Sequence, residues 1–386
     1  MTRLLLTCTD LMTIQFMVPH IRYLAENGFK VDLACSVVGD RLEDVKNAVG
    51  DVANIHTLRL MRSPFSPVNL KGYGDLKKLL SENEYDIIWT NEPVMGVMTR
   101  FAARKARKKG TKVLYMAHGF HFFKGAPLLN WLMWAPTEIF MSRFNDILVT
   151  INWEDYNWAK KHTHTPVIKH IDGIGVDFSN RESVVSRDEK RAQLGITEND
   201  ILILSVGELQ KRKNHQAIIK AIAKLDDPRI KYIICGQGVL ENHLLKLATS
   251  LNVDKQVSFL GYRADIPEIM SACDIYAHPS IREGLGLASL EAMASGLPLI
   301  TSNVQGVPDY VENGVTGYMC APMDVDGYAE NLHKLTSDKS LRKNIGKTNV
   351  TYVQKYRVEV IEPVIKEILN ECYTPEKETV KVEVKI

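Results

Sequence analysis

The sequence predicts an α/β protein made of two doubly wound domains that face each other across a cleft. Its 386 residues exceed what a single hydrophobic core usually serves. Short apolar runs alternate with helical patterns, which is typical of βαβ units and parallel sheets. The alternation stops in residues 171–183, where glycine and polar residues cluster, and it resumes at Ile201. We therefore predict one domain over residues 1–172 and a second over residues 173–350.

The first half contains apolar runs with the length and composition of buried parallel strands. They occupy residues 3–9, 30–35, 86–91, 112–119 and 146–151. Helical patterns lie between them, for example in residues 16–28 and 95–110.

The second half repeats this arrangement. Its predicted strands occupy residues 201–209, 231–236, 256–261, 274–280 and 298–303. A helical pattern over residues 214–225 separates two of them. Both halves therefore predict a Rossmann-like sheet, and ligands of such sheets bind outside the carboxyl ends of the strands. The polar residues 373–386 predict a frayed tail.

Composition excludes several classes of protein. The six cysteines are scattered without metal-ligand spacing, which indicates buried thiols in a reducing cytoplasm. No apolar run is long enough to span a membrane, and the first residues predict a strand rather than a signal peptide. Net charge is only +2, and we predict no nucleic-acid partner.

The charge is unevenly distributed, because residues 1–170 carry 22 Lys and Arg against 16 Asp and Glu. The basic run 100–112 is either a solvated helix face or a surface facing anionic lipid. The aromatic stretch 120–144 is either core or, together with that run, a face that docks on a membrane.

Two glutamates flank a glycine-rich loop at a predicted helix start. Glu283 and Glu291 enclose Gly284-Leu285-Gly286-Leu287, and the helix is expected to begin near Leu287. A helix N-terminus suits phosphate, and glycine permits close backbone approach. A carboxylate accepts hydrogen bonds from two neighbouring hydroxyls, as in a ribose. Taken singly, Glu291 is a first-turn acid and Glu283 a solvated loop residue, but together they suggest a nucleotide-sugar site.

At this point the sequence resembles a known family. Residues 281–300 resemble the E-x7-E signature of family 4 glycosyltransferases, which have the GT-B fold, and the similarity continues to Tyr318. Residues 205–215 and 259–280 resemble the family's phosphate-contacting and base-binding regions, respectively. In the first half, residues 116–127 and 149–161 resemble enzymes of bacterial exopolysaccharide and capsule clusters. The resemblance covers roughly residues 1–365 and implies that a helix near 351–372 packs back on the first domain.

The resemblance assigns roles to particular positions. Lys213 matches the family's phosphate lysine, and the cleft-facing His118 lies near the donor sugar. Many members have an arginine after the glycine that matches Gly207, but here that residue is Glu208, so Arg212 or Lys211 is expected to assist Lys213. The predicted catalytic residues are His118, Lys213 and Glu283. The predicted donor-binding residues are Gly207, Arg212, Lys213, Gly261, Tyr262, Arg263, Gly284, Leu285, Gly286, Leu287 and Glu291.

Three further features are interpreted from the residues themselves. Thr9, Asp10 and Thr13, in the first predicted loop, are candidate contacts for an acceptor hydroxyl. Asn214 is expected to cap the helix that follows the basic cluster. Asp324-Val325-Asp326 has the D-x-D pattern of metal-dependent transferases, but its place before a helical pattern favours an N-cap. We predict neither a metal nor another cofactor. Residues 236–238 lack the third glycine of a dinucleotide fingerprint.

These observations predict a glycosyltransferase that moves a sugar from a nucleotide-sugar, most simply a UDP-sugar, to an acceptor hydroxyl. The resemblance implies retention of anomeric configuration and a lipid-linked saccharide acceptor for surface polysaccharide, used in the cytoplasm at the inner face of the membrane. Two alternatives stay open. One is a UDP-N-acetyl sugar epimerase of the same fold, and the other is a non-catalytic partner subunit that binds nucleotide-sugars.

Overall fold

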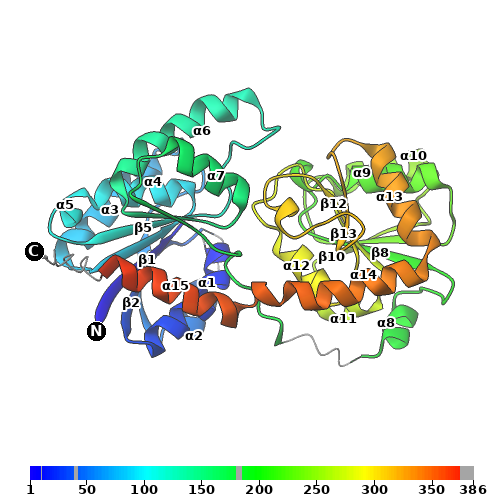
Figure 1. Ribbon diagram of the computed structural model, residues 1–386, viewed down its shortest axis with the longest axis horizontal. Helices are drawn as coiled ribbons and strands as arrows, with labels where there is room; N and C mark the ends of the chain where they lie inside the picture. Colours follow the sequence, from blue (N-terminus) through cyan, green and yellow to red (C-terminus); the bar gives the residue numbers. More distant parts are fainter. Residues whose placement is uncertain (10, 39–41, 180–184, 374–386) are drawn as a thin grey trace, which may run out of the picture.

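The computed structural model describes residues 1–9, 11–38, 42–179 and 185–373. Within them the chain forms two parallel sheets, each covered by helices on both faces (Figure 1). The predicted fold class is therefore confirmed. Asp10 and the tail beyond residue 373, for which predictions were made, lie outside the described residues.

The first sheet has seven parallel strands in the order β3-β2-β1-β4-β5-β6-β7. Its strands are β1 (Thr2–Cys8), β2 (Phe29–Ser36), β3 (Ala53–Leu58), β4 (Ile87–Asn91), β5 (Lys112–Ala117), β6 (Ile147–Thr150) and β7 (Val167–His170). Its helices are α1 (Leu11–Glu26), α2 (Leu42–Val49), α3 (Val68–Glu82), α4 (Pro93–Ala102), α5 (Arg104–Arg107), α6 (Leu128–Met141) and α7 (Trp153–His162).

The second sheet has six parallel strands in the order β10-β9-β8-β11-β12-β13. Its strands are β8 (Ile201–Val206), β9 (Ile230–Cys235), β10 (Val257–Gly261), β11 (Ile275–His278), β12 (Leu299–Ser302) and β13 (Gly317–Cys320). Its helices are α8 (Arg187–Gln193), α9 (Gln216–Leu225), α10 (Glu241–Ser250), α11 (Ile266–Ala272), α12 (Leu287–Ala294), α13 (Val325–Ser337) and α14 (Lys339–Tyr352).

The strands that the sequence failed to predict are β3, β7 and β13. Each lies at an edge of its sheet, where one side of the strand has no neighbour in the sheet. Their side chains are mostly half-buried or exposed, in contrast to the fully buried run of β4. A continuous apolar run indicates a strand that is covered on both faces. These edge strands lack such a run, so the sequence pattern indicates them only weakly.

The chain returns to the first domain at its end. After α14 it continues into α15 (Val358–Tyr373), which packs against α1 (Figure 1). Lys366 donates to Asn27 at 2.8 Å, and Glu371 pairs with Lys169 at 2.8 Å. Just before α15, Arg357 forms a β-bridge with Val176 of the linker between β7 and α8. The predicted boundary after residue 172 lies in this same linker between β7 and α8.

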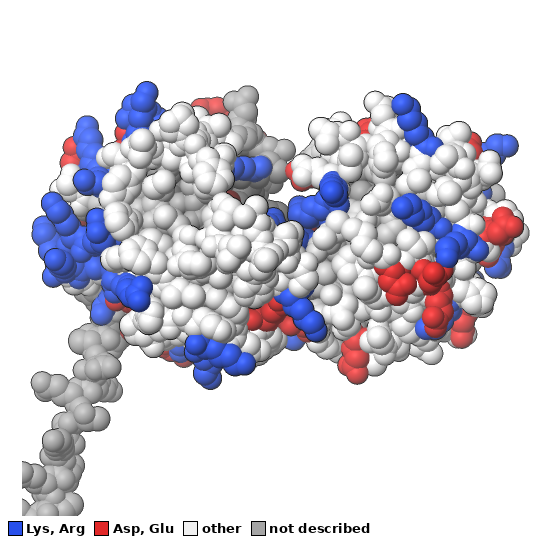
Figure 2. Space-filling model, turned by 90° about the horizontal axis from the view of Figure 1, so that it is seen from above, with Lys and Arg blue, Asp and Glu red and all other residues white. Residues whose placement is uncertain are grey.

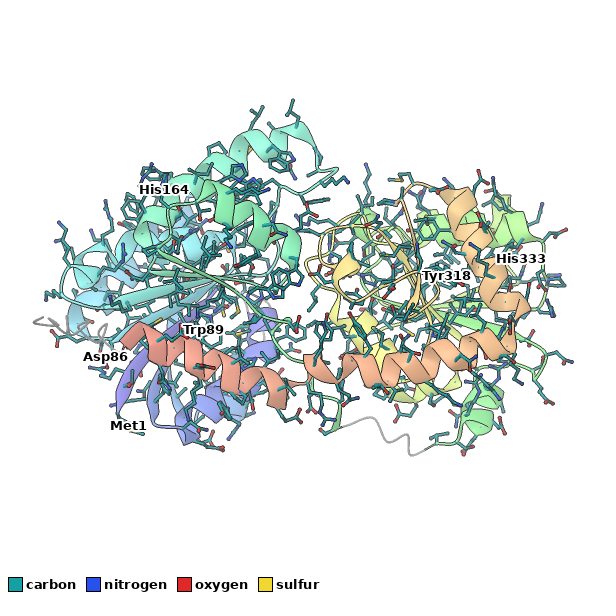
Figure 3. The ribbon with its side chains drawn as sticks, viewed as in Figure 1. Met1, Asp86, Trp89, His164, Tyr318 and His333 are labelled. Atoms are coloured by element: carbon teal, nitrogen blue, oxygen red, sulfur yellow. The ribbon has the colours of Figure 1, made fainter. Side chains whose placement is uncertain are left out.

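The core of the first sheet reaches towards this returning helix. Trp89 of β4, labelled in Figure 3, is fully buried. Its ring meets that of His20 edge to face, with the ring centroids 6.1 Å apart. Five of the six cysteines are buried and all six are free thiols, as the sequence predicted. Burial raises the pKa of the Cys35 thiol to about 12, so this thiol stays protonated near neutral pH.

Part of the basic run 100–112 is structural. Arg100 is buried, lies over the Tyr115 ring and pairs with Glu138 at 2.9 Å. Arg107 pairs with Asp146 at 2.7 Å. The expectation that this whole run forms a surface is therefore wrong for Arg100. No helix in the described part of the chain combines the length and apolar character that crossing a membrane requires.

Candidate active site

A cavity of about 470 Å³ lies between the two domains. The loops that line it follow β4 and β5 in the first sheet and β8, β11 and β12 in the second. The cavity thus occupies the carboxyl ends of strands from both sheets, where ligands of doubly wound domains bind. Seven of the predicted site residues line it, and these are His118, Arg212, Glu283, Gly284, Leu285, Gly286 and Leu287.

The charged centre of the site is Glu283. Its Oε2 accepts from Lys213 Nζ at 2.7 Å and lies 2.9 Å from His278 Nε2 and 3.4 Å from Arg212 Nη1. Burial alone would raise the pKa of Glu283, but the Lys213 ammonium outweighs burial and, with His278 and Arg212, holds that pKa well below its usual range. Glu283 is therefore ionised, and it fixes the Lys213 ammonium beside the glycine-rich loop.

Lys213 reaches Glu283 from a loop that contacts with neighbouring residues hold in place. Residues Lys211–Lys213 form a 3-10 turn after β8, and the lysine stem lies against Gly207, where an added Cβ would come within 3.2 Å of Lys213 Cε. Asn214 follows with a positive φ of 55°, and its amide donates to the carbonyl oxygens of Pro279 and Pro322 at 3.0 and 2.7 Å. The prediction that Asn214 caps the next helix is wrong, since α9 begins at Gln216 without a side-chain cap. Asn214 instead ties this loop to the end of β11.

Lys211 and Glu208 do not take part in the charged centre. Lys211 is exposed and lines a small depression with His243 rather than the cleft. Of the two residues that the sequence offered as helpers of Lys213, the structure thus brings only Arg212 to the cleft.

The helix after the glycine-rich loop begins where the sequence predicted, since α12 starts at Leu287 with Gly286 as its N-cap. Gly286 has a φ of +90°, which favours glycine. Gly284 is required for another reason. A Cβ at that position would lie 2.1 Å from the carbonyl oxygen of His118, because the first-domain loop crosses directly over it. The glycine predicted to admit a ligand therefore also admits the opposite domain.

Polar bonds between the domains surround that crossing. Gln305 Nε2 donates to the Phe120 carbonyl at 2.9 Å, Asn152 Nδ2 to the Gly284 carbonyl at 3.2 Å, and the Trp153 N–H to Asp309 Oδ2 at 2.9 Å. Apart from Gly284, the sequence analysis gave none of these residues a role, although all of them lie in segments that resemble the family. They join segments more than 130 positions apart, and only the tertiary structure brings them together.

His118 lies in the first-domain loop that contacts Gly284. Its Nε2 lies 2.9 Å from Asn91 Oδ1, at the end of β4. Burial lowers the pKa of His118 to about 4, with a smaller contribution from His20. The ring is therefore neutral at physiological pH and suits hydrogen bonding to an uncharged sugar better than binding of phosphate.

The predicted base-binding residues lie outside this cavity. Gly261 has a φ of +65° and Tyr262 is 70% exposed. Arg263 donates to Asp265 at 2.7 and 2.5 Å, and Asp265 also pairs with Lys190 at 2.8 Å. The guanidinium of Arg263 is thus held within its own loop, so a base would meet the backbone and Tyr262 here.

Glu291 lies in the second turn of α12 and is half-buried. Burial chiefly raises the pKa of Tyr276, and the Glu291 charge adds to that rise, so this carboxylate stands close to β11. Glu291 does not line the 470 Å³ cavity, nor do Gly207 and Lys213. The structure therefore divides the predicted donor residues between the cavity and a region beside β8 and β11.

The predicted acceptor loop meets a residue that the sequence analysis missed. Glu92 accepts from the Thr9 N–H at 2.5 Å and from Thr13 Oγ1 at 2.6 Å. Glu92 has a φ of 65° and a ψ of 156°, a conformation that residues other than glycine rarely adopt. Strain of this kind concentrates at functional sites, and Glu92 and Thr13 both line the cavity.

The D-x-D pattern is structural, as predicted. Asp324 caps α13 by accepting from the Gly327 N–H at 2.8 Å, and Asp326 pairs with Lys224. Among the described residues no three His, Cys, Asp or Glu side chains gather in a way that could hold a metal ion. That the protein works without a metal stays a prediction.

Comparison with known proteins decides the family. Residues 186–350 match the family model of group 1 glycosyl transferases, and residues 5–152 match a glycosyl transferase 4-like model. The putative glycosyltransferase EpsD of Bacillus subtilis is 34% identical over 353 residues, which cover 90% of this chain and 91% of EpsD. The chain belongs to the family 4 glycosyltransferases. It is therefore a glycosyltransferase with the GT-B fold.

Two further comparisons agree with this assignment. A UDP-Gal:α-D-GlcNAc-diphosphoundecaprenol α-1,3-galactosyltransferase of Escherichia coli is 30% identical over 82% of this glycosyltransferase and 83% of the E. coli enzyme. The crystal structure of Anabaena HepE with UDP and glucose superposes with a TM-score of 0.80, covering 96% of this chain and all of HepE, at 20% identity. At that identity the structural likeness supports the fold alone.

Proposed function

We propose that this glycosyltransferase transfers a sugar from a UDP-sugar to a hydroxyl of a lipid-linked saccharide, with retention of anomeric configuration. The observation that carries the proposal is the cluster of Lys213, Arg212 and Glu283 beside the N-terminus of α12 at the cleft. Two cations and the free N–H groups of a helix end stabilise the charge that develops on a departing diphosphate. The donor and the acceptor in the E. coli enzyme's name support the choice of both.

In this mechanism the protein positions the donor and stabilises the leaving group. Glu283 is ionised and bonded to Lys213, so it orients the phosphate-binding lysine and is a poor nucleophile. Glu291 binds the ribose, and the residues around Gly261 contact the base. His118, which is neutral, contacts the donor sugar. The departing phosphate takes the proton of the attacking hydroxyl, so the reaction needs no separate base.

The first test is release of UDP across a panel of UDP-sugars, without acceptor and then with lipid-linked saccharides or simple glycosides. Slow release from one or two donors, accelerated by an acceptor, is expected. The anomeric coupling constant of the product then tests retention. Isomerised sugar in the absence of acceptor would instead assign an epimerase, and donor binding without turnover on any acceptor would assign a binding subunit.

A lipid-linked acceptor requires access to a membrane surface. Leu128, Leu129 and Leu132 of α6 are each more than 60% exposed. Figure 2 shows Lys and Arg gathered at one end of the first domain, beside a largely uncharged surface. The exposed cations Arg104 and Lys105 come from α5, at that end of the domain. Sedimentation with anionic vesicles, lost on replacing Leu128 and Leu132 by Ser, would support peripheral binding, and unchanged sedimentation would count against it.

A further inference from the structure

A second cavity of about 340 Å³ opens beside the cleft and has no role in the reaction as described so far. It shares part of its wall with the main cavity, including Glu92, His121, Trp134 and Arg282. Of the lining residues that the structure describes, all except Arg282 come from the first domain. A ligand that extends from the reaction centre into this cavity would therefore lie on the acceptor side and meet a single cation of the donor side.

Arg282 lines both this cavity and the main cavity, where the two meet. Its carbonyl oxygen accepts from Arg212 at 3.5 Å. Burial, and secondly the charge of Arg212, lower the pKa of Arg282, while Glu283 raises it. Burial, and secondly the charge of Arg282, lower the pKa of His121 to about 4. No carboxylate in the described ranges forms an ion pair with Arg282, because the neighbouring Glu283 is bonded to Lys213 and His278. Arg282 is thus a half-buried cation that suits an anionic ligand.

Other groups on the wall fit the same ligand. Arg62, on the loop between β3 and α3, contributes a second guanidinium to the lining. The hydroxyl of Thr9 is buried and has no hydrogen-bond partner among the residues that the structure describes. Among the described lining residues the one carboxylate is Glu92, which has an oxygen bonded to each of two donors, the Thr9 N–H and the Thr13 hydroxyl. Two guanidiniums and a hydroxyl form a set of donors that matches phosphate.

Beside these donors lies an aromatic wall. The rings of His121 and Trp134 have centroids 5.3 Å apart, and the pKa of His121 shows that its imidazole is neutral near pH 7. Pockets for organic ligands combine such apolar surfaces with a few placed polar groups. A sugar ring therefore fits between the reaction centre and the cationic end of the cavity.

We propose that this cavity binds the phosphate or diphosphate group of the acceptor, held by Arg282 and Arg62 with the Thr9 hydroxyl. The proposal rests on the proposed function and adds to it that the acceptor is a saccharide whose reducing end is phosphorylated. Arg282 then connects the donor and acceptor sites, because it lies beside Arg212, immediately precedes Glu283 in the sequence and lines the second cavity. The phosphate belongs to a lipid carrier or to a free sugar phosphate, and these two sources share the same chemistry.

The test compares kcat/KM for acceptors that differ only in phosphorylation. N-acetylglucosamine, glucose and galactose are each supplied as octyl glycoside, as alkyl diphosphate-linked sugar and as sugar 1-phosphate. The wild type is expected to prefer phosphorylated acceptors by at least about tenfold, as for charge-assisted hydrogen bonds. Equal use of the octyl glycosides would overturn the proposal. Preference for the alkyl diphosphates over the 1-phosphates would assign a lipid-linked acceptor, and the reverse would assign a soluble one.

Variants then locate the subsite. Arg282→Ala is expected to lower the preference for phosphorylated acceptors roughly ten- to a hundredfold, with a smaller effect on donor affinity. Arg282→Lys should restore part of the preference. Arg59→Ala is the control, because Arg59 is an exposed arginine that pairs with Asp75 and lines neither cavity. An Arg282→Ala variant that loses donor affinity and keeps its acceptor preference would place Arg282 in the donor site and overturn the proposal.

The two proposals fail in different ways. Transfer to neutral and phosphorylated acceptors alike would leave the transferase intact and remove the phosphate subsite. Absence of transfer with every donor and acceptor would remove the proposed function. Calorimetric titration with the alkyl diphosphate sugars would then decide the subsite on its own. Binding that Arg282→Ala weakens would support it, and absence of binding to the wild type would overturn it.

Discussion

The two faces of the cleft hold their functional groups in opposite ways. On the second-domain face Lys213 and Glu283 form an ion pair at 2.7 Å, with Arg212 and His278 beside them. On the first-domain face the side chain of His118 is neutral and bonds to Asn91. The proposed donor face therefore presents preorganised charge that suits a diphosphate, whereas the proposed acceptor face around His118 offers neutral hydrogen bonds. This difference separates stabilisation of the leaving group from recognition of the sugars.

The strongest way to break this comparison is to remove charge from the donor face. Lys213→Met should lower kcat roughly tenfold to a thousandfold, because one preorganised charge contact to the leaving group is lost. Lys211→Met is the matched control, since Lys211 is exposed and outside the cleft. Steady-state rates of UDP release measure both variants. Wild-type turnover of Lys213→Met would remove the assigned role.

A smaller effect is expected beside β11. Glu291→Gln keeps the size of the side chain but weakens hydrogen bonds to a ribose diol, so the donor KM should rise roughly tenfold to a hundredfold. Turnover at saturating donor should change much less, because the ribose does not react. The measurement is a donor titration at fixed acceptor. Unchanged donor KM would contradict the ribose assignment.

The neutral state of the first-domain face is testable by pH. The native pKa of His118, about 4, lies below the unfolded value of 6.5. As the pH falls from 7 to 5, the unfolded chain gains a proton at this position that the native protein does not, so the contribution of His118 to stability decreases. Relative to His118→Asn, the wild type should lose up to about 2 kcal/mol of unfolding free energy over this range.

Urea unfolding at pH 7 and pH 5 measures that difference, and NMR titration of the imidazole measures the pKa directly. A pKa near 6.5 would show that the ring charges in the physiological range and would remove the contrast between the two faces.

The smallest expected effect concerns the D-x-D pattern. Asp324→Ala removes the N-cap of α13 and should lower the free energy of unfolding by about 1 kcal/mol. Transfer activity should not change, and a chelator should not affect the wild type. Thermal unfolding and UDP release provide the two measurements. Loss of activity without loss of stability would instead give Asp324 a functional role.

The fold could be predicted because its interior strands are continuous apolar runs. β4, β5, β6, β8, β11 and β12 lie within predicted segments, and β1 and β9 begin one residue before theirs. The missed strands β3, β7 and β13 lie at sheet edges and bury fewer side chains. The start of α12 was predictable as well, since Gly286 supplies the positive φ that its N-cap requires.

The sequence by itself predicted which groups of the proposed donor face come together, because they follow neighbouring strands of one sheet in short, recognisable loops. Lys213 and Glu283 meet where β8 and β11 pair in parallel, so their loops end at the same edge. Only the tertiary structure decided the acceptor face. Its groups come from β1, β4, β5 and the loop after β3, and Arg282 reaches them from the opposite domain. Residue spacing along the chain does not predict this contact between the domains, because it depends on how the two sheets pack across the cleft.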